Sequence, residues 1–281
     1  MTARFLTFSL GDEPGYTARA HLAMLAMMAQ APAGSEFLLI TDRPQHFRWF
    51  GDRVRVSGID AATLRSWRGP QDFFWRIEIE VLRHAASFGP ADLVYFDSDV
   101  LARRPVDELV QALGAGDVFM HLHEHDLASS PRRGQRELWH LVQSRIIAGS
   151  PVIPPAPMWN AGVMAVGQQN LALIDRVLAA CDELTAAGIT HFLTEQFAYS
   201  HVFAATGRLR AASPWMDHFW GNKPGYDQDI YQQLALIHCR GLSVSEAVAF
   251  VRDHPIVRPL MVRRRWWNRY FTNLAGVDRR N

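Results

Sequence analysis

The sequence contains few cysteines and almost no lysine. Its 281 residues include two cysteines, Cys181 and Cys239, which are too few and too far apart for a disulfide-stabilised scaffold. We therefore expect free thiols and a cytoplasmic location, which the lack of a signal-peptide pattern also favours. The longest apolar run, near residues 22–29, is too short to span a bilayer. Lysine occurs once, as Lys223, beside 28 arginines.

Charge is distributed unevenly along the chain. The 20% of charged and 48% of hydrophobic residues are ordinary for a globular enzyme with a sizeable core. Residues 252–281 contain eight arginines and two aspartates, whereas residues 1–251 carry a net charge of −5. We therefore expect a single domain over residues 1–251, followed by a basic tail that contacts an anionic surface.

The tail is also rich in aromatic residues. Between Arg263 and Phe271, four arginines are interleaved with four aromatic residues. Aromatic rings favour the membrane–water interface, and basic residues favour anionic lipids. The pattern is consistent with peripheral contact at the inner face of a membrane, or with packing of the aromatic residues onto the domain. We do not expect it to bind nucleic acid.

Strands and helices alternate along the chain in the predicted secondary structure. Short apolar runs predict strands, and apolar residues at helical spacing predict helices. Such alternation is typical of a doubly wound α/β fold with a mainly parallel sheet. The predicted strands cover residues 5–10, 37–40, 54–56, 93–96, 118–123, 160–166 and 234–238; the predicted helices cover residues 17–30, 73–87, 136–146, 170–188 (capped by Asn170) and 194–206.

The run Leu93–Asp99 is the most informative segment for function. Four apolar residues end in Asp97-Ser98-Asp99. In an open α/β sheet, ligands lie at the carboxyl ends of the strands. Carboxylates there can hold a Mg²⁺ or Mn²⁺ ion that keeps coordination sites free for substrate phosphates. The alternative is an acidic turn, because aspartate and serine are common turn residues.

Three later segments complete a family resemblance. They are Trp159-Asn-Ala-Gly-Val163, Thr194-Glu-Gln196 and His218-Phe-Trp-Gly-Asn-Lys-Pro224. With Phe96–Asp99 before them, the chain resembles the GT-A glycosyltransferases, and among these the glycogenin and bacterial galactosyltransferase group, over roughly residues 4–240. The resemblance implies a Rossmann-like, doubly wound mixed sheet. It also implies a metal-dependent enzyme that moves a sugar from a nucleotide sugar, expected to be a UDP-sugar, to a glycan or lipid-linked acceptor.

The resemblance implies a metal site as well. Asp97 and Asp99 match the aspartates that bind Mn²⁺, or Mg²⁺, in this group. The third ligand of the group is a histidine in a His-x-x-Gly-x-x-Lys-Pro pattern, which His218 and its neighbours partly match. Lys223 stands one residue earlier than that pattern requires, at an expected phosphate contact. His238, at the end of a predicted strand, is the alternative third ligand.

Further residues are expected to contact the donor. Asn160 matches an asparagine that helps bind the donor sugar, and Gly162 would let the backbone approach a ligand. Glu195-Gln196 resembles an Asp-Gln pair near the anomeric carbon, and the group implies retention of anomeric configuration. The other expected donor contacts are Arg76, Ser98, Ala161, Gly221 and Lys223, with Asp42 facing the nucleotide base.

Alternating histidines follow the predicted strand at residues 118–123. On an extended strand His121, His123 and His125 would share one face, where they could bind Zn²⁺ or line the acceptor side of a cleft. Glu124 and Asp126 are expected contacts of acceptor hydroxyls.

Two other functional classes compete with a transferase. A phosphohydrolase of the haloacid dehalogenase type also has Asp-x-Asp after an apolar strand, but near the N-terminus and with a later acidic pair. In this chain the motif lies a third of the way along, and the predicted late strand ends in His238. The other alternative is a non-catalytic protein that binds nucleotide sugars.

Overall fold

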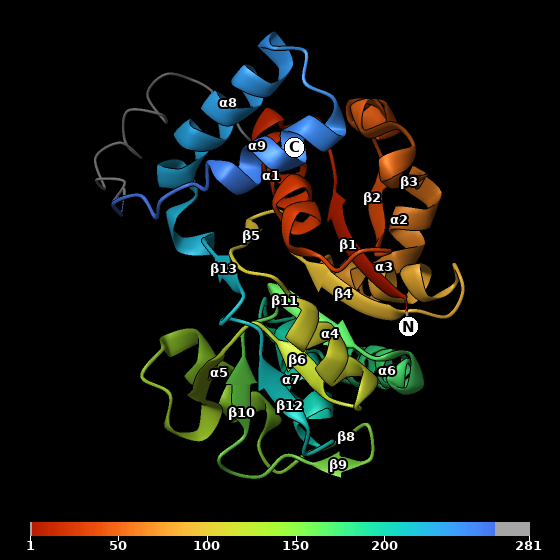
Figure 1. The fold of residues 1–281 in the computed structure, drawn as a ribbon. Coiled ribbons are helices and arrows are strands. Elements are labelled where there is room, and N and C mark those ends of the chain that lie inside the picture. The colour runs from red at the N-terminus through yellow and green to blue at the C-terminus, as the bar shows by residue number, and fades with distance from the viewer. Residues whose placement is uncertain (1, 262–281) are drawn as a thin grey trace, which may run out of the picture.

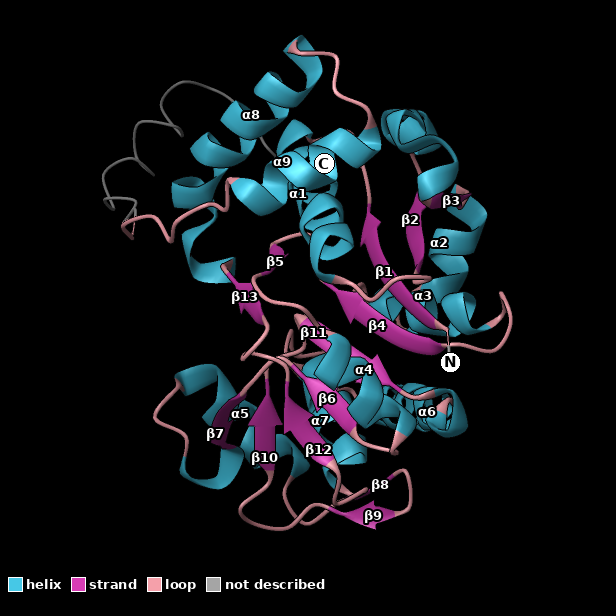
Figure 2. Cartoon of the chain, viewed as in Figure 1, coloured by secondary structure: helices cyan, strands magenta, loops and turns pink. Residues whose placement is uncertain are grey.

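A seven-stranded mixed sheet forms the centre of the molecule (Figure 2). The computed structural model describes residues 2–261. The strand order is β12-β6-β11-β4-β1-β2-β3, with β11 antiparallel to β4 and β6 and the other neighbours parallel. The strands are β1 (Ala3–Ser9), β2 (Glu36–Thr41), β3 (Arg55–Gly58), β4 (Asp92–Phe96), β6 (Val118–Met120), β11 (Val163–Val166) and β12 (Leu209–Ala211).

Helices cover both faces of this sheet (Figure 1). One face packs against α1 (Pro14–Gln30), α4 (Asp107–Gly114), α8 (Lys223–Cys239) and α9 (Val244–Asp253). The other face packs against α2 (Ala61–Trp67), α3 (Arg76–Ala86), α6 (Ala172–Ala186) and α7 (Thr194–Ala204). These two cores confirm the predicted doubly wound, mixed α/β sheet.

Shorter elements stand beside the sheet. They are α5 (Arg133–Val142), the strand pairs β5 (Val100–Ala102) with β13 (Met216–His218), β7 (His123–Asp126) with β10 (Pro157–Trp159), and β8 (Ile146–Ile147) with β9 (Ser150–Pro151), and the 3-10 turns η1 (Pro44–Arg53), η2 (Leu127–Ser129), η3 (Gln168–Asn170) and η4 (Trp220–Asn222).

Strand β4 is buried on both faces. Leu93 and Tyr95 belong to the core on one side of the sheet, and Val94 and Phe96 belong to the core on the other. A strand that is covered on both sides consists of consecutive apolar residues, and for this reason the strand could be predicted from the sequence. Each of these side chains contributes roughly 1.5–3 kcal/mol by leaving water. The strand therefore gives the aspartates that follow it a rigid base.

The predicted strand at residues 234–238 is wrong. These residues form the C-terminal part of α8. Ile230, Leu234 and Ile237 all pack into the core beside α1, and their spacing is that of a helix. A short apolar run does not distinguish a strand from a buried helical segment.

Asn170 does not cap a helix as predicted. It lies in η3, and its side-chain amide donates to the carbonyl oxygen of Gly116 at 3.1 Å. Helix α6 begins after it, at Ala172, without a side-chain cap.

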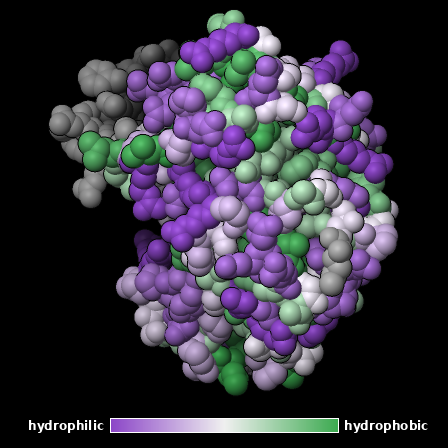
Figure 3. Space-filling model, in the orientation of Figure 1, coloured by the Kyte–Doolittle hydropathy of each residue, from purple (hydrophilic) through white to green (hydrophobic). Residues whose placement is uncertain are grey.

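The described chain continues past the predicted domain boundary at residue 251. That boundary falls inside α9, and the next residues run back along the domain. Arg103 donates to the carbonyl oxygen of Ile256 at 2.7 Å, and Arg258 forms an ion pair with Asp217 at 3.0 Å. Figure 3 shows hydrophobic atoms beside the grey ones, on a face where hydrophilic and hydrophobic residues are mixed. The basic aromatic sequence at residues 263–271 lies outside the described residues.

Within residues 2–261, no helix is both long enough and apolar enough to cross a membrane.

Candidate metal and donor site

The two aspartates occupy a tight turn at the carboxyl end of β4. The backbone N–H of Asp97 donates to the carbonyl oxygen of Gly162, and the N–H of Val100 closes the turn on the carbonyl oxygen of Asp97. The hydroxyl of Tyr95, buried in the core, donates to Oδ1 of Asp97. The turn is thus tied to a neighbouring segment as well as to its own strand.

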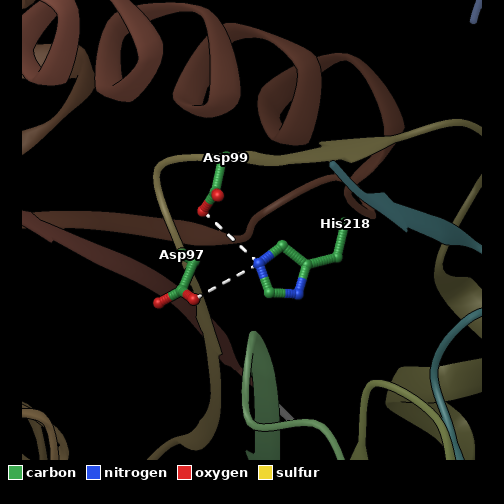
Figure 4. Close-up of side chains that lie close together, drawn as sticks. All are labelled: Asp97, Asp99 and His218. Atoms are coloured by element: carbon green, nitrogen blue, oxygen red, sulfur yellow. Dashed lines mark ion pairs between the residues drawn. The ribbon is translucent and has the colours of Figure 1, made fainter. Parts of the chain in front are cut away.

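A two-stranded ribbon places His218 beside this turn. Strand β5, which follows the aspartates, pairs with β13 so that Val100 lies opposite His218. The Nε2 atom of His218 lies 3.4 Å from Oδ1 of Asp99 and 3.6 Å from Oδ2 of Asp97 (Figure 4). Ligand atoms of these three residues all lie within 4.8 Å of one another. The sequence-predicted metal ligands are therefore brought together.

Gly162 leaves room for the histidine ring. A Cβ atom at this position would lie 2.1 Å from Nδ1 of His218, far inside any real contact. Glycine is therefore required where the ring lies against the backbone. Such a cradle fits a histidine that is held in one place to bind an ion.

His238 lies elsewhere. It belongs to the last turn of α8, and its ring packs edge-on against Trp49 with 5.1 Å between ring centroids. Among the described residues, the group able to hold a metal ion contains His218 and not His238.

The ionisable groups of the site shift one another's pKa values. Burial alone would raise the pKa of Asp99, but His218 and Lys223 lower it below its ordinary value. Burial and the neighbouring Asp99 raise the pKa of Asp97. Burial opposes the charged form of His218, yet the two carboxylates raise its pKa. The Nζ atom of Lys223 lies 2.9 Å from Oδ2 of Asp99. The site therefore places two carboxylates close to the ammonium group of Lys223 and the imidazole of His218.

A pocket of about 520 Å³ opens beside the aspartates. This volume lies within the range of sites for small ligands. It is lined by Trp75, Glu78, Asp97, Asp99, Glu124, Arg132, Gly134, Gln135, Asn160, Ala161, Gly162, Phe192, Leu193, Glu195, Gln196, His218, Trp220 and Lys223. Most of the predicted donor contacts are in this set.

The first turn of α7 contributes polar atoms without partners. Oε1 of Glu195 and Nε2 of Gln196 are buried, and neither has a hydrogen-bond partner within residues 2–261. Burial raises the pKa of Glu195 well above its usual value, with the charge of Asp97 adding to the effect. Buried polar groups without partners are rare in proteins and call for an explanation such as a bound ligand.

Arg76 does not face the pocket, contrary to the prediction. Its guanidinium group lies 2.7 Å from Asp182 and 2.8 Å from Glu80, and it also donates to the carbonyl oxygen of Trp67. Residues two apart on a helix point about 200° apart. Because Glu78 lines the pocket, Arg76 faces α6 instead.

Glu78 and Trp75 were missed by the sequence reasoning. They lie three residues apart on one face of the chain as it enters α3. Burial, and then the charge of Glu195, raises the pKa of Glu78 well above its usual value. The three-residue spacing of Trp75 and Glu78 indicates that the two side chains share one face of a helix. The local sequence does not indicate which face of the helix lines the pocket.

Gly221 is exposed in η4, and a Cβ atom there would meet nothing within 4 Å. It is absent from the residues that line the pocket. Ser98 lies in the turn between the two aspartates, and it too is absent from the lining. Oδ1 of Asp42 accepts from the N–H of Gly11 at 2.8 Å, and its contact with a base stays a prediction.

His121 does not lie on the same strand as His123 and His125. Strand β6 ends before His121, and β7 begins at His123. Nε2 of His121 lies 3.1 Å from the carbonyl oxygen of Met216, whereas His123 pairs with Asp126 at 3.0 Å. Within the part of the chain that is described, they form no metal-binding group. Glu124 lines the pocket and Asp126 does not.

Comparisons with known proteins support the fold. No family model and no curated protein matches the chain. The structure is similar to that of mouse xyloside xylosyltransferase 1 in its apo form, with a TM-score of 0.50 and 12% sequence identity, over 75% of this chain and 85% of that chain. At this identity the likeness shows the fold, which is GT-A-like. The finer resemblance to the glycogenin and bacterial galactosyltransferase group stays a prediction.

Proposed function

We propose that this chain is a metal-dependent glycosyltransferase that takes its sugar from a nucleotide sugar. The observation that carries the proposal is the placement of Asp97, Asp99 and His218 at the edge of one pocket. The two aspartates stand at the carboxyl end of the central strand β4, where open α/β sheets bind ligands, and β13 brings His218 to them. The GT-A-like fold supports the same class.

Asp97, Asp99 and His218 would hold the cation. A divalent ion bound there would stabilise, as a Lewis acid, the negative charge that the leaving nucleoside diphosphate gains. Two carboxylates suit either Mg²⁺ or Mn²⁺, but an imidazole ligand favours the softer Mn²⁺. The hydroxyl of Tyr95 donates a hydrogen bond to the carboxylate of Asp97 and so holds its orientation.

Lys223 is the expected phosphate contact. It is the single lysine of the chain, it lines the pocket, and it stands at the start of the 17-residue helix α8. Its ammonium group and the positive end of the helix dipole both favour a phosphate there.

The other end of the pocket suits a sugar. Glu195 and Gln196 present buried polar atoms without partners, which sugar hydroxyls could satisfy. Trp75, Phe192 and Trp220 are large exposed hydrophobic side chains that line the same pocket. Exposed apolar groups with a few polar ones between them are typical of ligand grooves.

We expect a UDP-sugar as donor and retention of configuration. An inverting enzyme needs a carboxylate base opposite the leaving group. In this chain the residue expected next to the anomeric carbon is Gln196, whose amide cannot act as such a base. Assignment of the product anomer by NMR decides between the two. An inverted product would make Glu195 the base.

A glycan or lipid-linked acceptor fits the basic aromatic sequence at residues 263–271. We expect the full chain to sediment with anionic liposomes at low salt and to be released at high salt. A chain that ends at Met261 keeps the bonds of Asn222 to Pro259 and Leu260 and should stay in the supernatant. If neither chain sediments with liposomes, the proposal that the enzyme binds its acceptor at a membrane is wrong.

A thermal-shift screen of nucleotide sugars tests the proposed function. Each sugar is offered with Mn²⁺, with Mg²⁺ and with a chelator. A donor at 100 times its Kd stabilises the fold by about 2.7 kcal/mol, so we expect at least one UDP-sugar to raise the Tm in a metal-dependent way. No shift with any nucleotide sugar would contradict the proposal. Binding without transfer or hydrolysis would favour the non-catalytic alternative.

A further inference from the structure

The side chain of Asn160 connects His218 to the segment around α5. We propose that Asn160 is a positioning residue for the metal site, and that Glu124 and the start of α5 hold it in place. This inference rests on the proposed function, because it takes Asp97, Asp99 and His218 as the cation ligands. It predicts that cation affinity depends on side chains that never touch the cation.

The orientation of the Asn160 amide follows from one backbone donor. The N–H of Gly162 lies 3.0 Å from Oδ1 of Asn160. A backbone N–H can only donate, so the atom facing it is the carbonyl oxygen of the amide and not its nitrogen. This removes the usual ambiguity of an asparagine side chain.

The same oxygen determines which nitrogen of His218 carries hydrogen. Nδ1 of His218 lies 2.8 Å from Oδ1 of Asn160. Because that oxygen only accepts, Nδ1 must be the donor. Nε2, which faces Asp97 and Asp99, is then the nitrogen that can offer a lone pair to a cation (Figure 4). Histidine ligands are commonly oriented by such a bond on their other nitrogen.

Glu124 fixes the opposite side of the amide. Nδ2 of Asn160 donates to Oε1 of Glu124 at 3.2 Å. A flipped amide would turn its NH₂ group toward Gly162 and His218, both of which are donors, and its oxygen toward the carboxylate. Glu124 thus favours the single orientation that holds His218.

Two side chains at the start of α5 hold Glu124 in turn. Its Oε2 atom accepts from Nη1 of Arg132 at 2.7 Å and from Nε2 of Gln135 at 2.8 Å. The amide oxygen of Gln135 accepts from the hydroxyl of Ser130 at 2.6 Å. The Glu124 side chain is 8% exposed, so it is shielded from water while it makes these bonds. The bonds form one series from α5 to Nε2 of His218.

Titration calorimetry with Mn²⁺ alone tests this series on the full-length protein. We expect Asn160→Ala to weaken Mn²⁺ binding by about 10- to 100-fold, the usual effect of losing a partner of a metal ligand, and Glu124→Ala by about 10-fold. Glu124→Gln keeps an oxygen that can accept from Asn160, but its NH₂ group would face the donors Arg132 and Gln135. It should therefore weaken binding less than Glu124→Ala without restoring the full affinity. Asp126→Asn, on the same strand β7 but outside the series, is the matched control and should bind as the unmodified protein does.

Nitrogen NMR of the histidine side chains supplies a second measurement. At a pH at which the imidazole of His218 is neutral, we expect its hydrogen to be on Nδ1 in the unmodified protein and to be shared between both nitrogens in Glu124→Ala. Unchanged Mn²⁺ affinity and an unchanged ring form in Glu124→Ala and Asn160→Ala would overturn the inference and leave the metal site standing. If the unmodified protein binds no Mn²⁺ at all, the metal site fails and the inference fails with it.

Discussion

The two ends of the pocket differ in how their polar groups are satisfied. At the metal end, Asp97, Asp99 and His218 face one another, Tyr95 donates a hydrogen bond to Asp97, and Lys223 forms an ion pair with Oδ2 of Asp99, which has no hydrogen-bond partner among residues 2–261. At the other end, Glu195 and Gln196 present buried atoms for which the described chain offers no partner. The protein itself brings the residues of the metal end together, whereas a bound ligand would have to supply the missing partners at the other end.

The buried polar atoms without partners lower the stability of the ligand-free protein. A buried polar atom without a partner costs roughly 1–3 kcal/mol. Proteins retain such costs mainly where function requires them. The sugar end would therefore recover its cost on binding.

Gln196→Ala should have the largest effect on the sugar end. If the amide acts beside the anomeric carbon, its loss should lower kcat by roughly 100-fold, as for other single groups that stabilise a transition state. The affinity for UDP and Mn²⁺ should hardly change, because Gln196 is not a metal ligand. Steady-state kinetics beside calorimetry separates the two quantities. An equal loss of turnover and of UDP affinity would place Gln196 at the wrong end of the pocket.

Gly162→Ala should disturb the metal end in an intermediate way. The new Cβ atom would overlap the ring of His218, which must move. We expect Mn²⁺ affinity to fall by about 10-fold and the free energy of unfolding by about 1–3 kcal/mol. Gly221→Ala is the control, because a Cβ atom there meets nothing within 4 Å. Equal behaviour of the two variants would show that His218 is not held by close contact with the backbone.

Glu195→Gln should act on the pH dependence of stability. The pKa of Glu195 is raised in the folded state, so above its unfolded pKa the unfolded chain loses its proton first. Stability is therefore lost as pH rises from the unfolded pKa toward the folded one. The loss is about 1.4 kcal/mol per pH unit in that window.

Glutamine does not titrate, so Glu195→Gln should be more stable than the unmodified protein near pH 7 and equal to it near pH 4. Thermal unfolding without metal measures this difference. Glu137→Gln, an exposed carboxylate on α5, provides the comparison. A constant difference across this pH range would mean that Glu195 is not buried as described.

The sequence predicted the metal end better than the sugar end. The apolar run Leu93–Phe96 indicates a strand that is covered on both faces, as β4 is, and the aspartates directly after it mark the end of that strand. Both signals are local. His218 required the resemblance, because only the pairing of β13 with β5 brings it to the turn.

The wrong predictions concerned which face of a helix meets the pocket, and contacts between residues that are far apart in the sequence. Arg76 and Glu78 stand in one helical segment, and only packing of α3 against α6 decided which of them met the pocket. His238 was assigned to a strand because the apolar run before it was too short to reveal its helical period. The bond between Asn160 and Glu124 joins residues 36 positions apart, which no local pattern indicates.

The binding of UDP with Mn²⁺ tests the metal site directly. Calorimetric titration should show UDP binding to the unmodified protein with Mn²⁺ and much weaker binding with a chelator. In Asp99→Asn the metal-dependent part should disappear while the circular dichroism spectrum stays unchanged. Asp117→Asn, which removes a carboxylate that pairs with Arg208 and Arg210 far from the pocket lining, should bind as the unmodified protein does. Unchanged UDP–Mn²⁺ affinity in Asp99→Asn would contradict the metal site and the proposed function together.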